Sequence, residues 1–236
     1  MDKRDNAFMH KEFPKQFSKD DFWSQIKRTV DGKPVSEENI DMIITQVKSH
    51  LELEPNSHLL DIGCGNGALA ARLFPYLKYY TGVDFSPYLL EVANEYFKPT
   101  DNIEYIENDA VNFVSTYPNT KGIDKLLIYG CISYLSYLEL ETFLQHVASR
   151  FMDMRTVFIG NIPDKNKADE FFEQRDLTDY ETDNENTPIG LWWHPNEIVQ
   201  IANSSGFNAT VAKMPDKFYA HRYRFDLVLE RNKVRT

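Results

Sequence analysis

The sequence has little of what would mark a secreted, membrane-spanning or metal-binding protein. Its 236 residues include only two cysteines, Cys64 and Cys131, which show neither a disulfide pattern nor metal-ligand spacing. No apolar run approaches the roughly 18 residues that a membrane-spanning helix requires. The first residues, MDKRDNAFMHKEF, lack the apolar stretch of a secretory signal. We therefore expect a soluble, cytoplasmic protein without a metal site.

Positive charge is also in short supply. Lys and Arg number 26 against 36 Asp and Glu, which gives a net charge of −10. Proteins that bind nucleic acid usually carry a basic surface, so we expect a small-molecule substrate and neither a nucleic acid nor a membrane as partner. The charge is uneven, because residues 164–186 are mostly acidic and residues 217–236 mostly basic. Solvated surface is the simplest interpretation of both runs.

The remaining composition suits one large α/β domain. Hydrophobic residues make up 42% and aromatic residues 14%, enough to fill a core. Short apolar stretches alternate with amphipathic helices and predict strands at 58–63, 79–85, 103–109, 124–132 and 156–162. Residues 208–214 and 221–231 then follow each other without a helix, so they should pair antiparallel. We predict a doubly wound, mostly parallel seven-stranded sheet with an antiparallel C-terminal hairpin.

Helix starts divide the chain further. Ser36 is placed as an N-cap between Val35 and Ile40, and Ser136 forms a capping box with Glu139. We interpret residues 1–35 as an N-terminal cap or lid segment and residues 36–236 as the main domain. A cap insertion is expected at about 164–190.

Three of only ten glycines fall within five positions, in LLDIGCGNG at residues 59–67. Gly63, Gly65 and Gly67 follow the first predicted strand, where ligands bind in such sheets. Without Cβ atoms they permit a tight turn and close approach of a ligand to the backbone, beside the N-terminus of the next helix. A tight turn without a ligand is the alternative, and three glycines at this spacing favour a binding site.

The glycine pattern is compatible with more than one cofactor. Gly63, Gly65 and Ala68 satisfy the dinucleotide pattern G-x-G-x-x-G/A, with Asp84 at about the expected distance, which keeps an NAD-dependent oxidoreductase open. Against it, Asp61 would place a carboxylate near a pyrophosphate. Little chain is left for a separate substrate domain, and the C-terminal hairpin is a third argument against this alternative.

LLDIGCGNG resembles the first motif, D-x-G-x-G-x-G, of class I S-adenosylmethionine (SAM) dependent methyltransferases. The resemblance extends over about residues 36–232 and includes GVDFS, with Asp84, and ENDA, with Asp109. It implies that SAM is the cofactor and S-adenosylhomocysteine (SAH) the product. The glycine turn would hold the methionine part, Asp84 the ribose hydroxyls and Asp109 the adenine amino group. The implied cofactor-binding residues are Asp61, Gly63, Cys64, Gly65, Gly67, Asp84, Phe85, Asp109 and Ala110.

The acceptor side is less well marked. His194, in LWWHPNEI, is a candidate general base, with a helix cap as the alternative. Asp164, directly after the fifth predicted strand, is a second catalytic candidate, with a turn aspartate as the alternative. Candidate substrate-binding residues are Trp23, Tyr134, Arg222 and Arg224, of which the two arginines would suit a phosphate or carboxylate. The alternative interpretations are that Tyr134 packs in the core and that the two arginines are solvated surface charges.

The segment DFWSQIKRTVDGKPVSEENIDMI, taken with the glycine motif, resembles methyltransferases of bacterial surface-polysaccharide biosynthesis. The resemblance implies methyl transfer to a small polar acceptor, a hydroxyl of a sugar or of a phosphorylated or nucleotide-linked molecule. Three alternatives remain: an N-methyltransferase of a small molecule, an NAD-dependent oxidoreductase, and a SAM-binding subunit without catalysis.

Overall fold

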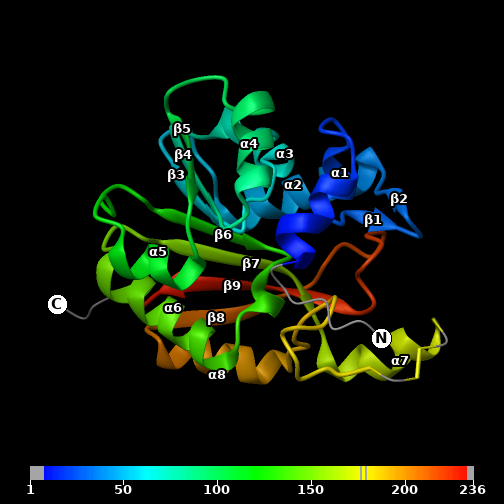
Figure 1. Ribbon diagram of the computed structural model, residues 1–236. Coiled ribbons are helices and arrows are strands. Elements are labelled where there is room, and N and C mark those ends of the chain that lie inside the picture. Colours follow the sequence, from blue (N-terminus) through cyan, green and yellow to red (C-terminus); the bar gives the residue numbers. More distant parts are fainter. Residues whose placement is uncertain (1–7, 176, 179, 233–236) are drawn as a thin grey trace.

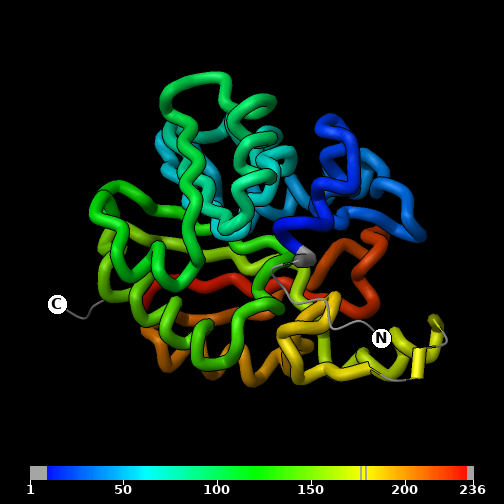
Figure 2. Tube along the Cα trace, viewed as in Figure 1, coloured from blue at the N-terminus to red at the C-terminus, as the bar shows by residue number. Residues whose placement is uncertain are grey.

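The computed structural model describes residues 8–175, 177–178 and 180–232, and a mixed sheet with helices on both faces forms its centre (Figures 1 and 2). In this part of the chain the strand order is β5-β4-β3-β6-β7-β9-β8. The first five strands in that order run parallel, while β9 is antiparallel to both neighbours. The predicted doubly wound seven-stranded sheet is therefore confirmed. The strands are β3 (His58–Ile62), β4 (Tyr79–Asp84), β5 (Ile103–Glu107), β6 (Lys125–Tyr129), β7 (Thr156–Pro163), β8 (Phe207–Ala212) and β9 (Arg224–Arg231).

Two cores lie on the two faces of the sheet. Because side chains alternate along a strand, Leu60 and Leu126 enter one core while Leu59 and Leu127 enter the other. The first core is covered by α5 (Ala110–Thr116), α6 (Tyr137–Arg150) and α8 (Pro195–Ser204). The second is covered by α2 (Glu37–Leu51), α3 (Ala68–Ala71) and α4 (Pro87–Tyr96).

The strand order reverses at β3, because the chain continues from β3 to β4 on one side and later adds β6 on the other. The loops that leave β3 and β6 therefore diverge and open a crevice at the carboxyl ends of the strands. Residues 63–67 follow β3 and residues 130–136 follow β6, so both segments lie at this switch point.

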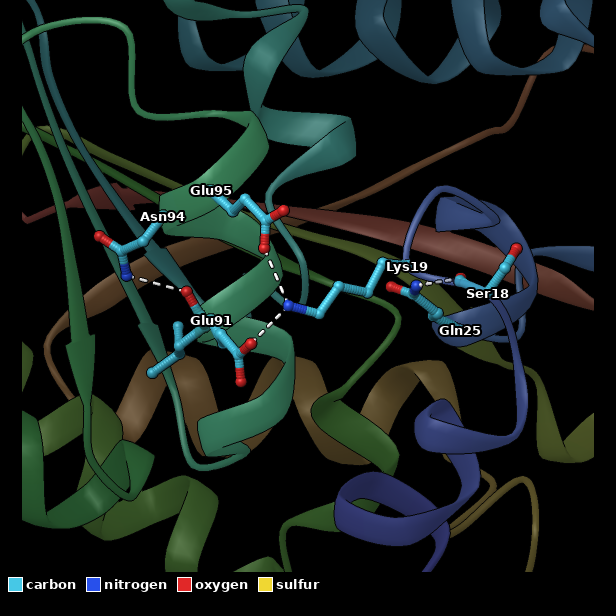
Figure 3. Close-up of polar contacts among 7 residues, drawn as sticks. Ser18, Lys19, Gln25, Glu91, Asn94 and Glu95 are labelled. Carbon is cyan, nitrogen blue, oxygen red and sulfur yellow. Dashed lines mark hydrogen bonds and ion pairs between the residues drawn. The ribbon is translucent and has the colours of Figure 1, made fainter.

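An N-terminal cap, residues 8–35, packs beside α4. It contains α1 (Phe22–Gln25) and a hairpin of β1 (Thr29–Val30) and β2 (Lys33–Pro34). Lys19 Nζ lies 2.5 Å from Glu91 Oε1 and 2.9 Å from Glu95 Oε2, both on α4 (Figure 3). Gln25 Nε2 donates to Ser18 O within the cap (Figure 3).

Two segments differ from the expected pattern. The helix after the glycine turn has only four residues, and a 3₁₀ turn at Phe74–Tyr76 with Pro75 follows it. The connection between β8 and β9 is not a simple hairpin loop, since residues 213–223 bury Met214 and Phe218 in the core beneath α2. The described residues include no helix with the length and apolar character needed to cross a membrane.

Candidate active site

A cavity of about 580 Å³ lies at the carboxyl ends of β3, β4, β5 and β6. One half is lined by the turn after β3 and by the residues that end β4 and β5. The other half is lined by the N-terminal cap, the loops after β6 and β7, α7 (Ala168–Glu173) and the residues before β9. Its volume is in the range of small-molecule and cofactor sites.

The glycine turn has a conformation that other residues would not tolerate. Gly63, Gly65 and Gly67 have φ of +72°, +58° and +78°, all left-handed. A Cβ would lie 2.5 Å from Cys131 Sγ at Gly63, 3.0 Å from Ile26 Cγ2 at Gly65 and 2.5 Å from the Tyr105 hydroxyl at Gly67. Gly63, Cys64 and Gly65 line the cavity, whereas Gly67 does not and its N donates to Cys64 O at 3.2 Å.

Asp84 closes β4 and holds the turn in place. Its Oδ2 accepts a hydrogen bond from Gly65 N at 2.9 Å, and its Oδ1 accepts one from Ser86 N at 2.9 Å. Burial raises the pKa of Asp84 above its usual range, while these backbone bonds oppose the shift. Each carboxylate oxygen has a second lone pair, so the group can also accept from a hydroxyl pair in the cavity.

Asp61 is a second buried carboxylate, at the start of the turn. Its Oδ2 accepts from the Tyr80 hydroxyl at 2.9 Å, and burial raises its pKa to about 7. The two aspartates give this half of the cavity an acidic character, which suits a cationic ligand.

Asp109 follows β5 and has a structural role of its own. Its Oδ1 accepts from Val111 N and Asn112 N, which caps α5. The residue is exposed and lines the cavity together with Phe85 and Ala110. The carboxylate therefore caps α5 and also lies where it can meet a ligand in the cavity.

The opposite half of the cavity is aromatic and basic. His10 from the N-terminal cap lies with its ring centroid 4.4 Å from that of Tyr134 and 5.6 Å from that of Phe85. Burial, with a smaller effect of Lys27, lowers the pKa of His10 to about 4, so the ring is neutral near pH 7. Burial also lowers the pKa of Lys27 to about 8.

The structure brings two of the six predicted catalytic and acceptor-side residues to the cavity, Tyr134 and Arg224. Trp23 instead packs against the core beneath α2, and Arg222 is exposed away from the lining.

Neither proposed catalytic residue lines the cavity. Asp164 Oδ1 accepts from Asn166 N at 3.0 Å, and His194 Nδ1 lies 2.9 Å from Asn166 Oδ1. Asp164 caps a short 3₁₀ turn and His194 stands at the N-cap of α8. The positions of both residues therefore agree with the alternatives, a turn aspartate for Asp164 and a helix cap for His194.

Sequence reasoning missed several residues that shape the site. The cap contributes His10 and Arg28, and the carboxyl-terminal parts of β6 and β7 contribute Tyr129 and Asn161. Asn66, within the glycine motif, is fully buried and joins the turn to the cap. The position of Asn66 between Gly65 and Gly67 could have marked it as part of the site, whereas the local sequence around the other four residues gave no such indication.

Comparisons with known proteins identify the region that carries the glycine turn. Residues 59–151 match the family described as "Methyltransferase domain". The chain is 32% identical over 103 residues to a probable cobalt-precorrin-6B C(15)-methyltransferase (decarboxylating) of Archaeoglobus fulgidus, covering 41% of this chain and 60% of that protein. It is 31% identical over 86 residues to a probable ribosomal RNA small subunit methyltransferase A of Methanosarcina acetivorans, covering 36% and 31%. The chain thus spans less than two thirds of these curated relatives.

Solved structures share the fold at low sequence identity. A magnesium protoporphyrin IX methyltransferase from Synechocystis PCC 6803 with bound SAH gives a TM-score of 0.60 at 16% identity, with 83% of each chain covered. A DhpI–SAM–HEP complex gives 0.62 at 14% identity, with 94% of each chain covered. The chain therefore has the Rossmann-like fold of SAM-dependent methyltransferases, and its glycine turn, Asp84 and Asp109 lie within the matched methyltransferase domain.

Proposed function

We propose that this protein is a SAM-dependent methyltransferase that acts on a small polar acceptor. The acceptor group is a hydroxyl of a sugar or of a phosphorylated or nucleotide-linked molecule, and the second product is SAH. One observation carries the proposal: the left-handed glycine turn is hydrogen-bonded to Asp84 and lines the cavity, within the residues that match a methyltransferase domain.

The residues present fit an adenosyl cofactor. The turn leaves open backbone at Gly63 and Gly65, where a ligand can lie against the main chain. Asp84 offers two acceptor oxygens for a ribose diol, and Asp109 offers an acceptor for an adenine amino group. Cys64, Phe85 and Ala110 complete the cofactor half. When bound, SAM would supply a methyl group activated for transfer by the positive charge of its sulfonium sulfur, and SAH would be the leaving group.

The chain's own part is to position the reactants and to exclude water. The buried carboxylates of Asp61 and Asp84 favour a cationic ligand at the turn. The N-terminal cap covers the turn, because Asn66 Nδ2 donates to Phe22 O at 2.7 Å and to Gln25 Oε1 at 2.8 Å. Alignment of this kind accounts for a large part of the rate of a displacement reaction. His194 and Asp164 are not part of this proposal, since neither lines the cavity.

The curated relatives include ribosomal RNA methyltransferases, so the acceptor class needs its own support. The net charge of −10 weighs against a phosphate backbone as ligand, and the cavity has a volume suited to a small molecule.

Calorimetric titration with SAM, SAH and NAD tests the proposal. We expect both adenosyl ligands to bind, with affinity about 10- to 100-fold weaker in Asp84→Ala, because a charged acceptor of two hydroxyls is lost. Asp101→Ala, at an exposed loop position, is the matched control. Asp84→Asn, which keeps the shape of the side chain, serves if the alanine variant does not fold.

Binding of NAD in place of the adenosyl ligands would identify an oxidoreductase and reject the proposal. After confirmed SAM binding, transfer of radiolabelled methyl groups to a panel of nucleotide-linked sugars, sugar phosphates and amines would name the acceptor. Tight SAM binding without transfer to any of them would favour the non-catalytic subunit.

A further inference from the structure

Two arginines in the basic half of the cavity have no carboxylate partner within the described residues. Arg28 is only 7% exposed, and its guanidinium carbon lies 4.8 Å from the centre of the Tyr129 ring. Its Nε is buried and has no hydrogen-bond partner there. A buried cation without a counter-ion is unfavourable, so this guanidinium is set up for a partner that the described chain does not supply.

Asn161 lies beside Arg28 at an irregular point of β7. The pairing with β9 shifts between Ile159 and Ile162, and Asn161 has a left-handed φ of +65°. The residue is 8% exposed, and its side-chain Oδ1 is buried without a partner. Strained backbone and unsatisfied polar groups of this kind concentrate at binding sites.

Gly130 shows that these groups converge. A Cβ at this residue would lie 3.3 Å from Asn161 Nδ2 and 3.6 Å from one terminal nitrogen of Arg28. Arg224 joins them from β9, because its Nη1 donates to Asn161 O at 2.6 Å. All four residues line the cavity.

The local charge balance favours an anion. The Asp226 carboxylate is turned to the backbone, where its Oδ1 accepts from Asn161 N at 2.8 Å, and it does not line the cavity; Asp31, which does line it, is exposed. The guanidinium groups of Arg28 and Arg224 therefore line the cavity, whereas the Asp226 carboxylate does not. The planar donor forks of arginine match the oxygens of carboxylates and phosphates.

We propose that Arg28, Asn161 and Arg224 form a subsite that binds a carboxylate or phosphate group of the methyl acceptor. This inference rests on the proposed function and narrows the acceptor to an anionic small molecule. The cofactor's own amino-acid carboxylate has the same chemistry. The position of Asn161 on β7 and of Arg224 on β9, two and three strands from the glycine turn after β3, favours the acceptor.

The test uses inorganic phosphate as the probe, titrated calorimetrically into protein saturated with SAH, so that the cofactor's carboxylate is already bound. We expect phosphate binding that weakens at least about tenfold in Arg28→Met and in Arg224→Met, because each removes a charge-assisted contact. Arg155→Met, an exposed arginine just before β7 and outside the cavity, should bind phosphate like the wild type. Arg28→Lys keeps the positive charge but not the planar guanidinium, so its phosphate affinity should lie between that of the wild type and that of Arg28→Met. It also serves as the test if Arg28→Met does not fold.

A second titration separates the two sources of the anion. SAH and 5′-methylthioadenosine, which lacks the amino-acid carboxylate, are compared on the same variants. Unchanged SAH affinity with lost phosphate binding supports the acceptor subsite. Arginine variants that weaken SAH but not methylthioadenosine would assign the subsite to the cofactor and overturn the inference. Phosphate binding that is equal in all variants would also overturn it, whereas a wild-type protein that binds no adenosyl ligand would reject the proposed function itself.

Discussion

At position 63, backbone conformation and side-chain packing both require glycine. The residue has φ +72°, and a Cβ would lie 2.5 Å from Cys131 Sγ and 3.0 Å from Cys131 Cβ. Gly122 has a similar φ of +81°, but nothing lies within 4 Å of the position a Cβ would take. The two glycines therefore separate the cost of the left-handed conformation from the cost of the contact.

We expect Gly122→Ala to lower the free energy of unfolding by about 1 kcal/mol, the cost of an alanine in left-handed conformation. Gly63→Ala should cost at least about twice as much, because the turn or Cys131 must also shift. It should weaken SAH binding as well. Denaturant unfolding and calorimetry of both variants measure these effects. Partial recovery is expected in Gly63→Ala/Cys131→Ala, and equal costs for the two single variants would contradict the contact.

At the residue scale, most residues predicted to bind the cofactor line the cavity, whereas most of those predicted for catalysis or the acceptor do not. Asp84 ends β4 and Asp109 comes two residues after β5, so two adjacent parallel strands bring them to one edge of the sheet. His194 and Asp164 were assigned from the strand they follow, and their loop instead directs them to Asn166. The direction of a loop depends on distant contacts, which a local pattern does not contain.

At the scale of elements, Asn66 holds the N-terminal cap onto the glycine turn. Its Nδ2 donates to Phe22 O and to Gln25 Oε1, and its Oδ1 accepts from Ala68 N at 3.2 Å. The side chain is fully buried, so its loss leaves buried acceptors without donors. The surface contact of Lys19 with Glu91 and Glu95 joins the cap to α4 instead, and it lies in solvent, where ion pairs contribute little.

We therefore expect Asn66→Ala to loosen the cap and Lys19→Met to leave it nearly unchanged. In Asn66→Ala, amide hydrogens of residues 18–35 should exchange at least about tenfold faster, which corresponds to a loss of more than about 1.4 kcal/mol of local stability. SAH should bind more weakly in the same variant. Hydrogen-exchange mass spectrometry of the two variants, with and without SAH, measures both effects. Equal exchange rates in the two variants would show that the buried amide does not hold the cap.

Helix starts and strand positions along the chain were predictable because their signals are local. The Ser136–Glu139 capping box and the Ser36 cap occur as expected, and the strands follow the apolar stretches. The β1–β2 hairpin around Asp31 and Gly32 was not predicted, and neither was the packing of residues 213–223 beneath α2. The hairpin pairs Val30 with Lys33 across an Asp-Gly turn, a local signal that sequence reasoning missed. The packing of residues 213–223 depends on contacts with α2, far along the chain.

At the scale of the whole molecule, buried ionisable groups make stability depend on pH in opposite directions. Burial raises the pKa of Asp61 to about 7 and that of Asp226 to about 6, so the folded protein holds these protons more firmly than the unfolded chain. Their contribution to stability is present at low pH and is lost as the pH rises through these values. His10, with its pKa lowered to about 4, destabilises the fold as the pH falls below about 6.5.

Asp226→Asn isolates one of these groups. The amide oxygen can still accept from Asn161 N, while the charge that burial disfavours is removed. Because the wild-type carboxyl must ionise within the fold above about pH 6, the variant should gain stability relative to the wild type as the pH rises. From pH 5 to pH 8 we expect this difference to grow by about 1–2 kcal/mol. Urea unfolding at pH 5, 6, 7 and 8 measures it, with Asp101→Asn as an exposed control that should show no such trend. A stability difference that stays constant, or shrinks toward pH 8, would mean that the nearby arginines stabilise the ionised Asp226 more than burial disfavours it.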